Sequence, residues 1–171
     1  KDETFEADRV VVTLPLGVLK ADLVEFRPSL PREKREAIRR LNMGVLNKVV
    51  LQYPEIFWRT DREFIGYMST HPGEFPEFLN LTRHIHKPFL MGFTGGDFAK
   101  AIEHFSKKEV MEQAHKVLQK IHGKSIPKPI NGIVAKWSSD PFARGAYSHI
   151  PVGATPSDYE TLSRPIKDRV Y

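Results

Sequence analysis

The sequence predicts an α+β fold in which a mixed, mostly antiparallel sheet is backed by helices. Three extended segments, residues 64–69, 75–81 and 89–93, follow one another and are separated by two turns that contain proline. A helix begins at the capping box of residues 106–109 and continues with apolar residues at helical spacing. Residues 9–14 form a β-branched and apolar run, which is typical of a strand covered on both faces, as in a parallel sheet.

Proline and periodicity predict the elements between these segments. The strand of residues 9–14 stops at Pro15, and Pro31 suits the first turn of a helix that runs to about Leu41. Residues 43–53 indicate another strand. Further predicted elements are a helix that ends at Gly123, a strand from 133 to 137 and a helical turn from 157 to 164.

Composition indicates a globular protein. Of the 171 residues, 40% are hydrophobic and 27% are charged, and no apolar run approaches the roughly 20 residues that a membrane span needs. The absence of cysteine excludes disulfides and thiolate metal sites. The net charge of +5 gathers in residues 32–40, where acidic residues interrupt the basic ones, as on a solvated helix face. We therefore expect a soluble, cytoplasmic protein with no membrane and no nucleic-acid partner.

Two polar patterns in the middle of the chain have simple structural explanations. His84 and His86 alternate, so on a strand both would point to one side, but no third ligand with suitable spacing lies nearby and no metal site is predicted. Residues 92–97 do not match the glycine-rich phosphate fingerprint. We expect them to form a turn in which Asp97 caps the next helix.

The segment KWSSDPFARGAYS, residues 136–148, predicts a loop that lines a pocket. The strand before it breaks at Asp140, and the loop places aromatic side chains and an arginine around Gly145. Large aromatic residues are also common in ordinary cores, so composition alone leaves that alternative open. The aromatic residues concerned are Trp137, Phe142 and Tyr147.

Lys48 is an unusual residue within the predicted strand of residues 43–53, because apolar residues flank it on both sides. Desolvating an unpaired charge is costly. Lys48 therefore either extends to solvent at a strand end or is held inside for a functional reason.

Three stretches resemble the flavin-dependent amine oxidases, the family of polyamine oxidases, monoamine oxidases and lysine-specific histone demethylases. They are ADRVVVTLPLGVLK at residues 7–20, GVLNKVVLQYPEIFW at residues 44–58, and KWSSDPFARGAYS at residues 136–148. The end of the chain, residues 165–171, resembles the family segment that precedes a Phe-Ala-Gly-Glu motif. Residues 59–129 carry no family motif, so they do not identify the amine.

The resemblance implies where FAD would lie. In the family, the strand that ends at the positions of Thr13, Leu14 and Pro15 belongs to the Rossmann-like FAD domain and passes close to the dinucleotide. Trp137 would pack near the isoalloxazine. These four residues are the expected cofactor-binding residues.

The resemblance also implies the catalytic residues. Lys48 falls on the family lysine that contacts the flavin N5 through a water, and Tyr147 falls on one wall of the aromatic cage that steers the amine. Monoamine oxidases carry a cysteine just before this tyrosine for covalent attachment of the flavin. Here the residue is Ala146, so we expect FAD to be held non-covalently, as in the polyamine oxidase and demethylase branch.

By this resemblance, the chain is a C-terminal piece of an FAD-dependent amine oxidase. Residues 1–30 and 141–171 would belong to the FAD-binding domain, with the rest of that domain missing from this chain, and residues 31–140 to the substrate-binding domain. The expected reaction oxidises a C–N bond of a (poly)amine, a small-molecule substrate, by hydride transfer to flavin, with oxygen as acceptor. The Gly-x-Gly-x-x-Gly unit is absent, so we expect the isolated chain to lack FAD and to be inactive.

Two alternatives to an amine oxidase remain open. The first is a flavoprotein oxidoreductase of the same fold that acts on a non-amine such as a carotenoid or protoporphyrinogen. The second is a binding module that keeps the fold without the chemistry.

Overall fold

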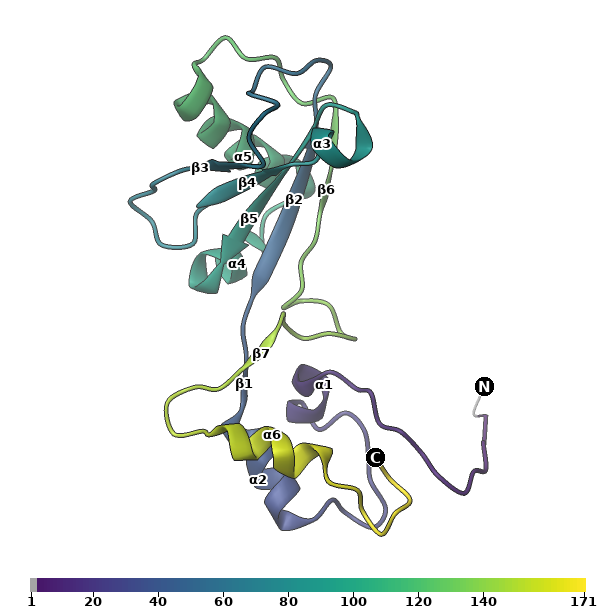
Figure 1. Cartoon of the computed structure of the whole chain (residues 1–171). Coiled ribbons are helices and arrows are strands. Elements are labelled where there is room, and N and C mark those ends of the chain that lie inside the picture. The colour runs from purple at the N-terminus through teal and green to yellow at the C-terminus, as the bar shows by residue number, and fades with distance from the viewer. Residues whose placement is uncertain (1–2) are drawn as a thin grey trace. The chain divides into compact units, whose positions relative to one another are not determined.

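The computed structural model describes residues 3–171, which form two compact units. The sheet unit comprises Gly44–Asp140 and Gly145–Tyr147. The helical unit comprises the chain up to Met43 together with Pro141–Arg144 and Ser148–Tyr171. Figure 1 labels the elements of both units.

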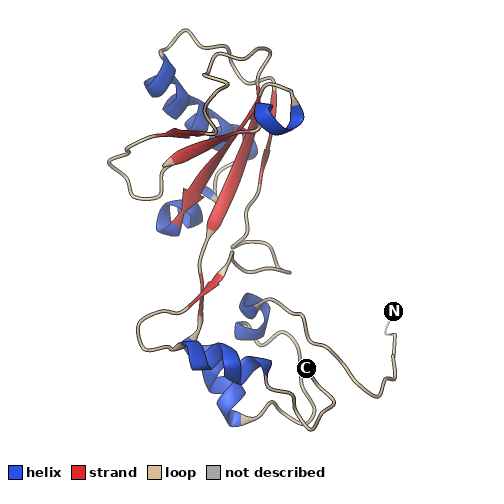
Figure 2. Cartoon of the chain, viewed as in Figure 1, coloured by secondary structure: helices blue, strands red, loops and turns tan. Residues whose placement is uncertain are grey.

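The sheet unit is built on five strands in the order β3-β4-β5-β2-β6. Figure 2 shows the strands in red. Every neighbouring pair in this sheet is antiparallel. Among residues 3–171, parallel pairing is limited to one bridge between Val10 and Val170 in the helical unit. The predicted α+β fold with a mostly antiparallel sheet is therefore confirmed. The strands are β2 (Leu46–Gln52), β3 (Phe64–Gly66), β4 (Glu77–Asn80), β5 (Phe89–Gly95) and β6 (Asn131–Val134).

The strand β2 lies between β5 and β6, and its two faces have different surroundings. Burial alternates along it: Asn47, Val49 and Leu51 are buried on the core face, whereas Lys48 and Val50 are half-buried on the other face. The predicted strand of residues 43–53 is thus broken. Its first part is the separate strand β1 (Asn42–Met43), which belongs to the helical unit.

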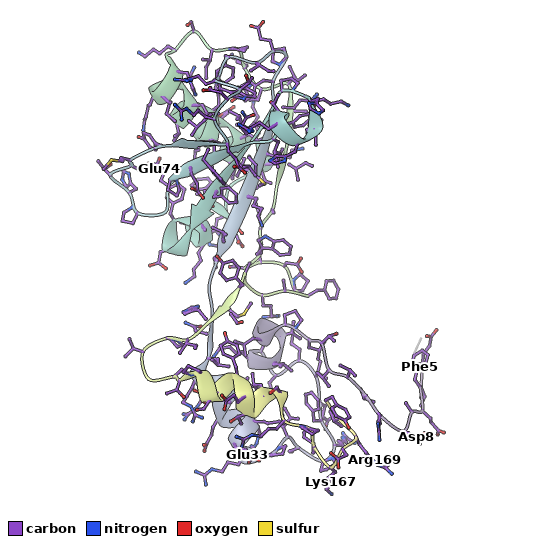
Figure 3. All side chains as sticks on the ribbon, in the orientation of Figure 1. Phe5, Asp8, Glu33, Glu74, Lys167 and Arg169 are labelled. Atoms are coloured by element: carbon purple, nitrogen blue, oxygen red, sulfur yellow. The ribbon has the colours of Figure 1, made fainter. Side chains whose placement is uncertain are left out.

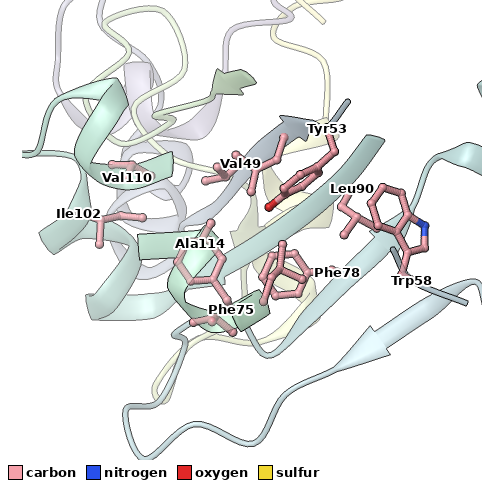
Figure 4. Packing of buried hydrophobic residues seen from close by; sticks show 12 residues of the cluster. Val49, Tyr53, Trp58, Phe75, Phe78, Leu90, Ile102, Val110 and Ala114 are labelled. Carbon is pink, nitrogen blue, oxygen red and sulfur yellow. The ribbon is translucent and has the colours of Figure 1, made fainter. Parts of the chain in front are cut away.

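The core of the sheet unit lies between the sheet and the helix α5 (Lys107–His122). Ser106 Oγ accepts a hydrogen bond from the Glu109 backbone N–H at 3.3 Å, and a Glu109 carboxylate oxygen accepts one from the Ser106 N–H at 2.7 Å. This confirms the predicted capping box. Figure 4 shows the apolar residues that strands, loops and helices bring together. They include Val49, Tyr53, Trp58, Phe75, Phe78, Leu90, Ile102, Val110 and Ala114.

The prediction that Asp97 caps a helix is wrong. The helix α4 (Gly96–Ile102) has Gly95, the last residue of β5, as its N-cap, so Asp97 already lies in the first turn. There Asp97 forms an ion pair with Lys100 at 3.3 Å. Because no residues separate the strand from the helix, the capping position falls earlier than the sequence pattern suggests.

The two histidines considered as metal ligands do not lie on a strand. His84 belongs to the short helix α3 (Thr82–Ile85), and His86 follows it in a left-handed conformation with φ of 53°. Among the described residues, no group of three or more His, Cys, Asp or Glu side chains is arranged to hold a metal ion. No helix within residues 3–171 is long and apolar enough to cross a membrane.

The helical unit packs three helices around a small apolar cluster. The helix α2 (Arg32–Arg40) begins after Pro31, as predicted, and buries Ala37 and Ile38, and its C-cap residue Leu41 is also buried. The structure groups α2 and β1 with this unit, although residues 31–43 were expected in the substrate-binding part. The other elements are α1 (Leu16–Lys20), α6 (Pro156–Ser163) and β7 (Ser148–His149), which pairs with β1.

The expectation that residues 9–14 form a strand covered on both faces is wrong. Val10 forms a single parallel bridge with Val170, supported by a hydrogen bond from the Val12 N–H to the Tyr171 carbonyl at 2.6 Å. The side chain of Val11 is 70% exposed. Figure 3 shows Phe5 and Asp8 on a segment that extends away from the helices of this unit. The segment forms no strand beyond this single bridge at Val10, and no second layer within the described residues covers it.

Candidate functional site

The strand β2 presents Lys48 and Asn47 on opposite faces. Lys48 is half-buried on the face away from the core, and its carbonyl accepts a hydrogen bond from the Ala135 N–H at 2.9 Å. Across the sheet its partner is Phe93 on β5. Lys48 therefore lies inside a central strand and not at a strand end, and no residue in the range 3–171 forms an ion pair or hydrogen bond with its ammonium group.

The backbone of Trp137 is held on both sides. Its N–H donates to Oδ1 of Asn47 at 2.9 Å, and its carbonyl accepts from the Gly145 N–H at 2.8 Å. The side chain is half-buried. Its indole Nε1 is buried and has no hydrogen-bond partner among the described residues. Buried donors are nearly always paired in folded proteins, so this N–H is suited to an acceptor supplied by a ligand.

Tyr147 follows Gly145 on the same loop and is tied to the start of β2. The Gly44 N–H donates to the Tyr147 carbonyl at 2.8 Å, and the Ala146 N–H donates to the Gly44 carbonyl at 2.9 Å. The peptide bond between Ala146 and Tyr147 is cis. The Tyr147 side chain is 68% exposed, so the alternative that it is an ordinary core aromatic is wrong.

The same alternative fails for Phe142, which lies in the helical unit and is 83% exposed. Trp137 is intermediate, since it is only half-buried.

The predicted cofactor-binding residues at the start of the chain lie in the helical unit. Thr13, Leu14 and Pro15 are exposed, and Pro15 is the N-cap of α1. Leu14 borders a cavity of about 190 Å³. Apolar residues make up most of its lining, among them Leu16, Leu19, Phe26, Leu30 and Ile38.

Gly17 lets the first and third family-like segments meet within the helical unit. A Cβ atom at Gly17 would lie 2.5 Å from the Arg144 carbonyl oxygen and 2.7 Å from that of Ala143. No side chain fits at such distances. The glycine is therefore required for the close approach of residues 143–144 to α1.

The structure brings three of the predicted site residues onto one framework. Lys48 lies on β2, and residues at or next to the start of that strand bind the backbones of Trp137 and Tyr147. Asn47, the residue that binds the Trp137 backbone, was not predicted as part of the site. The signal was available, because an asparagine in a buried apolar strand requires hydrogen-bond partners.

Comparison with known proteins identifies relatives over the whole chain. The profile of the family described as flavin containing amine oxidoreductase matches residues 1–171. The protein named Lysine-specific histone demethylase 1 homolog 1 from Oryza sativa subsp. japonica is 38% identical over 175 residues, which cover 99% of this chain. The protein named Lysine-specific histone demethylase 1 homolog 3 from Arabidopsis thaliana is 37% identical over 171 residues, which cover 98% of this chain.

The fold also matches a solved structure. Wild-type putrescine oxidase bound to putrescine superposes with a TM-score of 0.77 over 96% of this chain, at 23% sequence identity. The chain spans 36% of the length of that protein. It spans 21% of the rice relative and 10% of the Arabidopsis relative.

Proposed function

The chain belongs to the flavin-containing amine oxidoreductase family, and from this premise we propose that it carries part of the substrate and flavin sites of an FAD-dependent amine oxidase. The observation that carries the proposal is the shared framework of Lys48, Trp137 and Tyr147. Lys48 lies on β2, and Asn47 of the same strand binds the backbone of Trp137. Gly44, two positions before β2, binds the backbone of Tyr147.

The residues present fit a flavin. The buried indole N–H of Trp137 has no acceptor within the described residues, and a flavin ring carries carbonyl and nitrogen acceptors. Thr13, Leu14 and Pro15, the other expected cofactor-binding residues, are exposed on the segment of the helical unit that precedes α1. Attachment would be non-covalent, because Ala146 offers no thiol and the chain contains no cysteine. The bound flavin supplies the hydride acceptor for the reaction.

Lys48 and Tyr147 would supply what the protein adds to this chemistry. Lys48 is half-buried and its ammonium has no protein partner within residues 3–171, so it is free to hold a water molecule at the flavin. The exposed ring of Tyr147 offers an aromatic face to a cationic amine, and such cation–π contacts are stronger when the site excludes water.

The proposed substrate is an amine whose C–N bond is oxidised. Curated relatives are named as lysine-specific histone demethylases, and the structural match is putrescine oxidase. A lysine side chain and putrescine are both primary aliphatic amines in their unmodified forms. We therefore propose two substrate candidates. One is a polyamine, which the sequence resemblance implied, and the other is a methylated lysine side chain.

Anaerobic mixing of the full-length protein with candidate amines tests this proposal. We expect the visible absorbance of the flavin to bleach with a polyamine such as spermine or with a peptide that contains methylated lysine, and to recover when oxygen is admitted. Bleaching by a carotenoid or protoporphyrinogen and by no amine would favour the non-amine oxidoreductase. A protein without bound flavin would favour a binding module.

A further inference from the structure

Glu103, directly after α4, binds the segment that carries Trp137. We call residues 136–139 the Trp137 loop. One carboxylate oxygen of Glu103 accepts hydrogen bonds from Nδ2 of Asn47 at 2.8 Å and from the Ser138 N–H at 2.9 Å. The other oxygen accepts from the Ser139 N–H at 2.7 Å. Charged acceptors form stronger hydrogen bonds than neutral ones, so this single carboxylate fixes two consecutive amides of the loop.

Glu103 also determines how Asn47 meets Trp137. Nδ2 of Asn47 donates to Glu103 and to the Ala99 carbonyl at 3.2 Å, while its Oδ1 accepts from the Trp137 N–H. An ionised carboxylate only accepts hydrogen bonds, so it requires the NH₂ end of the asparagine on its own side. The oxygen is then left facing Trp137. Glu103 therefore acts on the three successive amides of residues 137–139, one of them through Asn47.

The Trp137 loop is tied to the end of α4 a second time through Lys136. Its Nζ donates to the Glu103 carbonyl at 2.7 Å and to the Phe105 carbonyl at 2.6 Å. The carbonyl at the C-cap of a helix lacks a partner inside the helix, and a lysine is a common donor to it. Phe105 lies three residues beyond α4. Four successive residues of the loop are thus held by groups at or just after the end of α4 and by Asn47.

The negative charge of Glu103 is stabilised by the Trp137 loop and not by the helix α4 that precedes it. A carboxylate at the C-terminal end of a helix is opposed by the helix dipole. Burial also raises the pKa of Glu103, but hydrogen bonds from Asn47, Ser138 and Ser139 outweigh burial and hold that pKa below its usual value. The charge is therefore stabilised by the loop and the asparagine.

We propose that Glu103 is a positioning residue of the flavin site, which sets where Trp137 meets the isoalloxazine by holding Asn47 and the amides of Ser138 and Ser139. This inference rests on the proposed function of Trp137. It assigns a role to a residue that lies 35 positions before Ser138 in the sequence and that does not itself need to touch the flavin.

Hydrogen exchange in the full-length flavoprotein tests the structural half of the proposal. Glu103→Gln keeps the size of the side chain but leaves one acceptor oxygen where there were two. We expect exchange at Ser138 and Ser139 to become about tenfold faster, the effect of losing roughly one hydrogen bond. Glu103→Asp keeps the charge and should restore part of the protection. Glu112→Gln, which removes an exposed charge from α5 of the same unit, is the matched control and should change neither amide.

The absorption spectrum and the reduction rate of the flavin test the functional half of the proposal. In Glu103→Gln we expect a shifted visible absorption band and slower flavin reduction at saturating amine, with the amine concentration for half-saturation unchanged. Unchanged exchange at Ser138 and Ser139 would overturn the proposal. So would faster exchange with an unchanged flavin spectrum and reduction rate, because Glu103 would then be merely structural. A wild-type protein that no amine reduces would contradict the proposed function instead, while the exchange result would still decide whether Glu103 holds the loop.

Discussion

Oδ1 of Asn47 accepts a hydrogen bond from the backbone N–H of Trp137, 90 residues further along the chain, at 2.9 Å. Asn47 is 1% exposed and immediately precedes Lys48 on β2. The bond therefore links the strand that carries the proposed catalytic lysine to the loop that carries the proposed flavin-packing tryptophan.

Replacing Asn47 with leucine should destabilise the fold. Leucine has a similar volume, but it leaves the Trp137 N–H without an acceptor and removes a donor from Glu103. The cost of unpaired buried groups predicts a fall of about 1–3 kcal/mol in the free energy of unfolding, measured by urea denaturation. The control is Gln52→Leu, a polar-to-apolar change at a half-buried position of the same strand, which should stay within about 0.5 kcal/mol. Equal effects of the two variants would contradict a special role for Asn47.

Stability should fall as the pH is lowered through about 6.5, the ordinary pKa of histidine. Burial lowers the pKa of His115, with a further contribution from the charge of Lys128, and burial also lowers the pKa of His122. Below pH 6.5 the unfolded chain binds protons that the folded protein resists, so acid favours unfolding. Thermal melting between pH 7.5 and 5.5 measures this slope.

The variant His115→Gln should flatten that slope, because glutamine does not titrate and can still pair with the Tyr53 hydroxyl. In the wild type this hydroxyl lies 3.1 Å from Nδ1 of His115. The exposed control His84→Gln should leave the slope unchanged. A slope that both variants share with the wild type would show that His115 does not contribute to it.

The isolated chain should not retain FAD. A helix N-terminus with a glycine-rich turn normally holds the pyrophosphate of a dinucleotide, and no Gly-x-Gly-x-x-Gly occurs in these 171 residues. Gel filtration of the chain after incubation with FAD measures this directly. A flavin absorbance band that elutes with the protein would contradict the expectation.

In the full-length protein, denaturation should release the flavin. Ala146 occupies the position at which the resemblance to monoamine oxidases would require a cysteine for covalent attachment. Precipitation with acid followed by centrifugation should leave free FAD in the supernatant. Flavin that remains with the pellet would show that this chain, or another part of the protein, attaches it covalently.

Local signals in the sequence predicted those elements whose determinants are close together in the chain. The capping box at Ser106 and the proline at position 31 place α5 and α2 because a helix start depends on neighbouring residues. Asp97 was predicted wrongly because the capping position depends on where β5 ends, and the pairing of β5 with β2 sets that end.

Contacts between distant residues could not be predicted in the same way. Nothing in the run at residues 9–14 indicates what covers its faces, and Val10 and Val11 are 50% and 70% exposed. Asn47 and Glu103 are 56 residues apart, and neither belongs to a pattern that names the other. The face on which Lys48 lies was easier to predict. Successive residues of a strand point to opposite faces, so Lys48 lies on the face opposite that of Asn47 and Val49.

Lys48→Met in the full-length protein tests whether Lys48 lies at the flavin. Methionine keeps the length and the apolar stem of lysine but removes the charged donor that would hold a water at the flavin. Lys48 is half-buried and has no protein partner within residues 3–171, so the melting temperature should hardly change. Val50→Met, two residues along on the same face of β2, is the control for the added side-chain flexibility.

Stopped-flow spectroscopy of the two half-reactions is the decisive measurement. If Lys48 lies at the flavin, Lys48→Met should slow flavin reduction by amine, or its reoxidation by oxygen, by at least about tenfold, while Val50→Met keeps wild-type rates in both. Wild-type rates in both half-reactions for Lys48→Met would show that Lys48 does not act at the flavin and is a lysine that only extends to solvent.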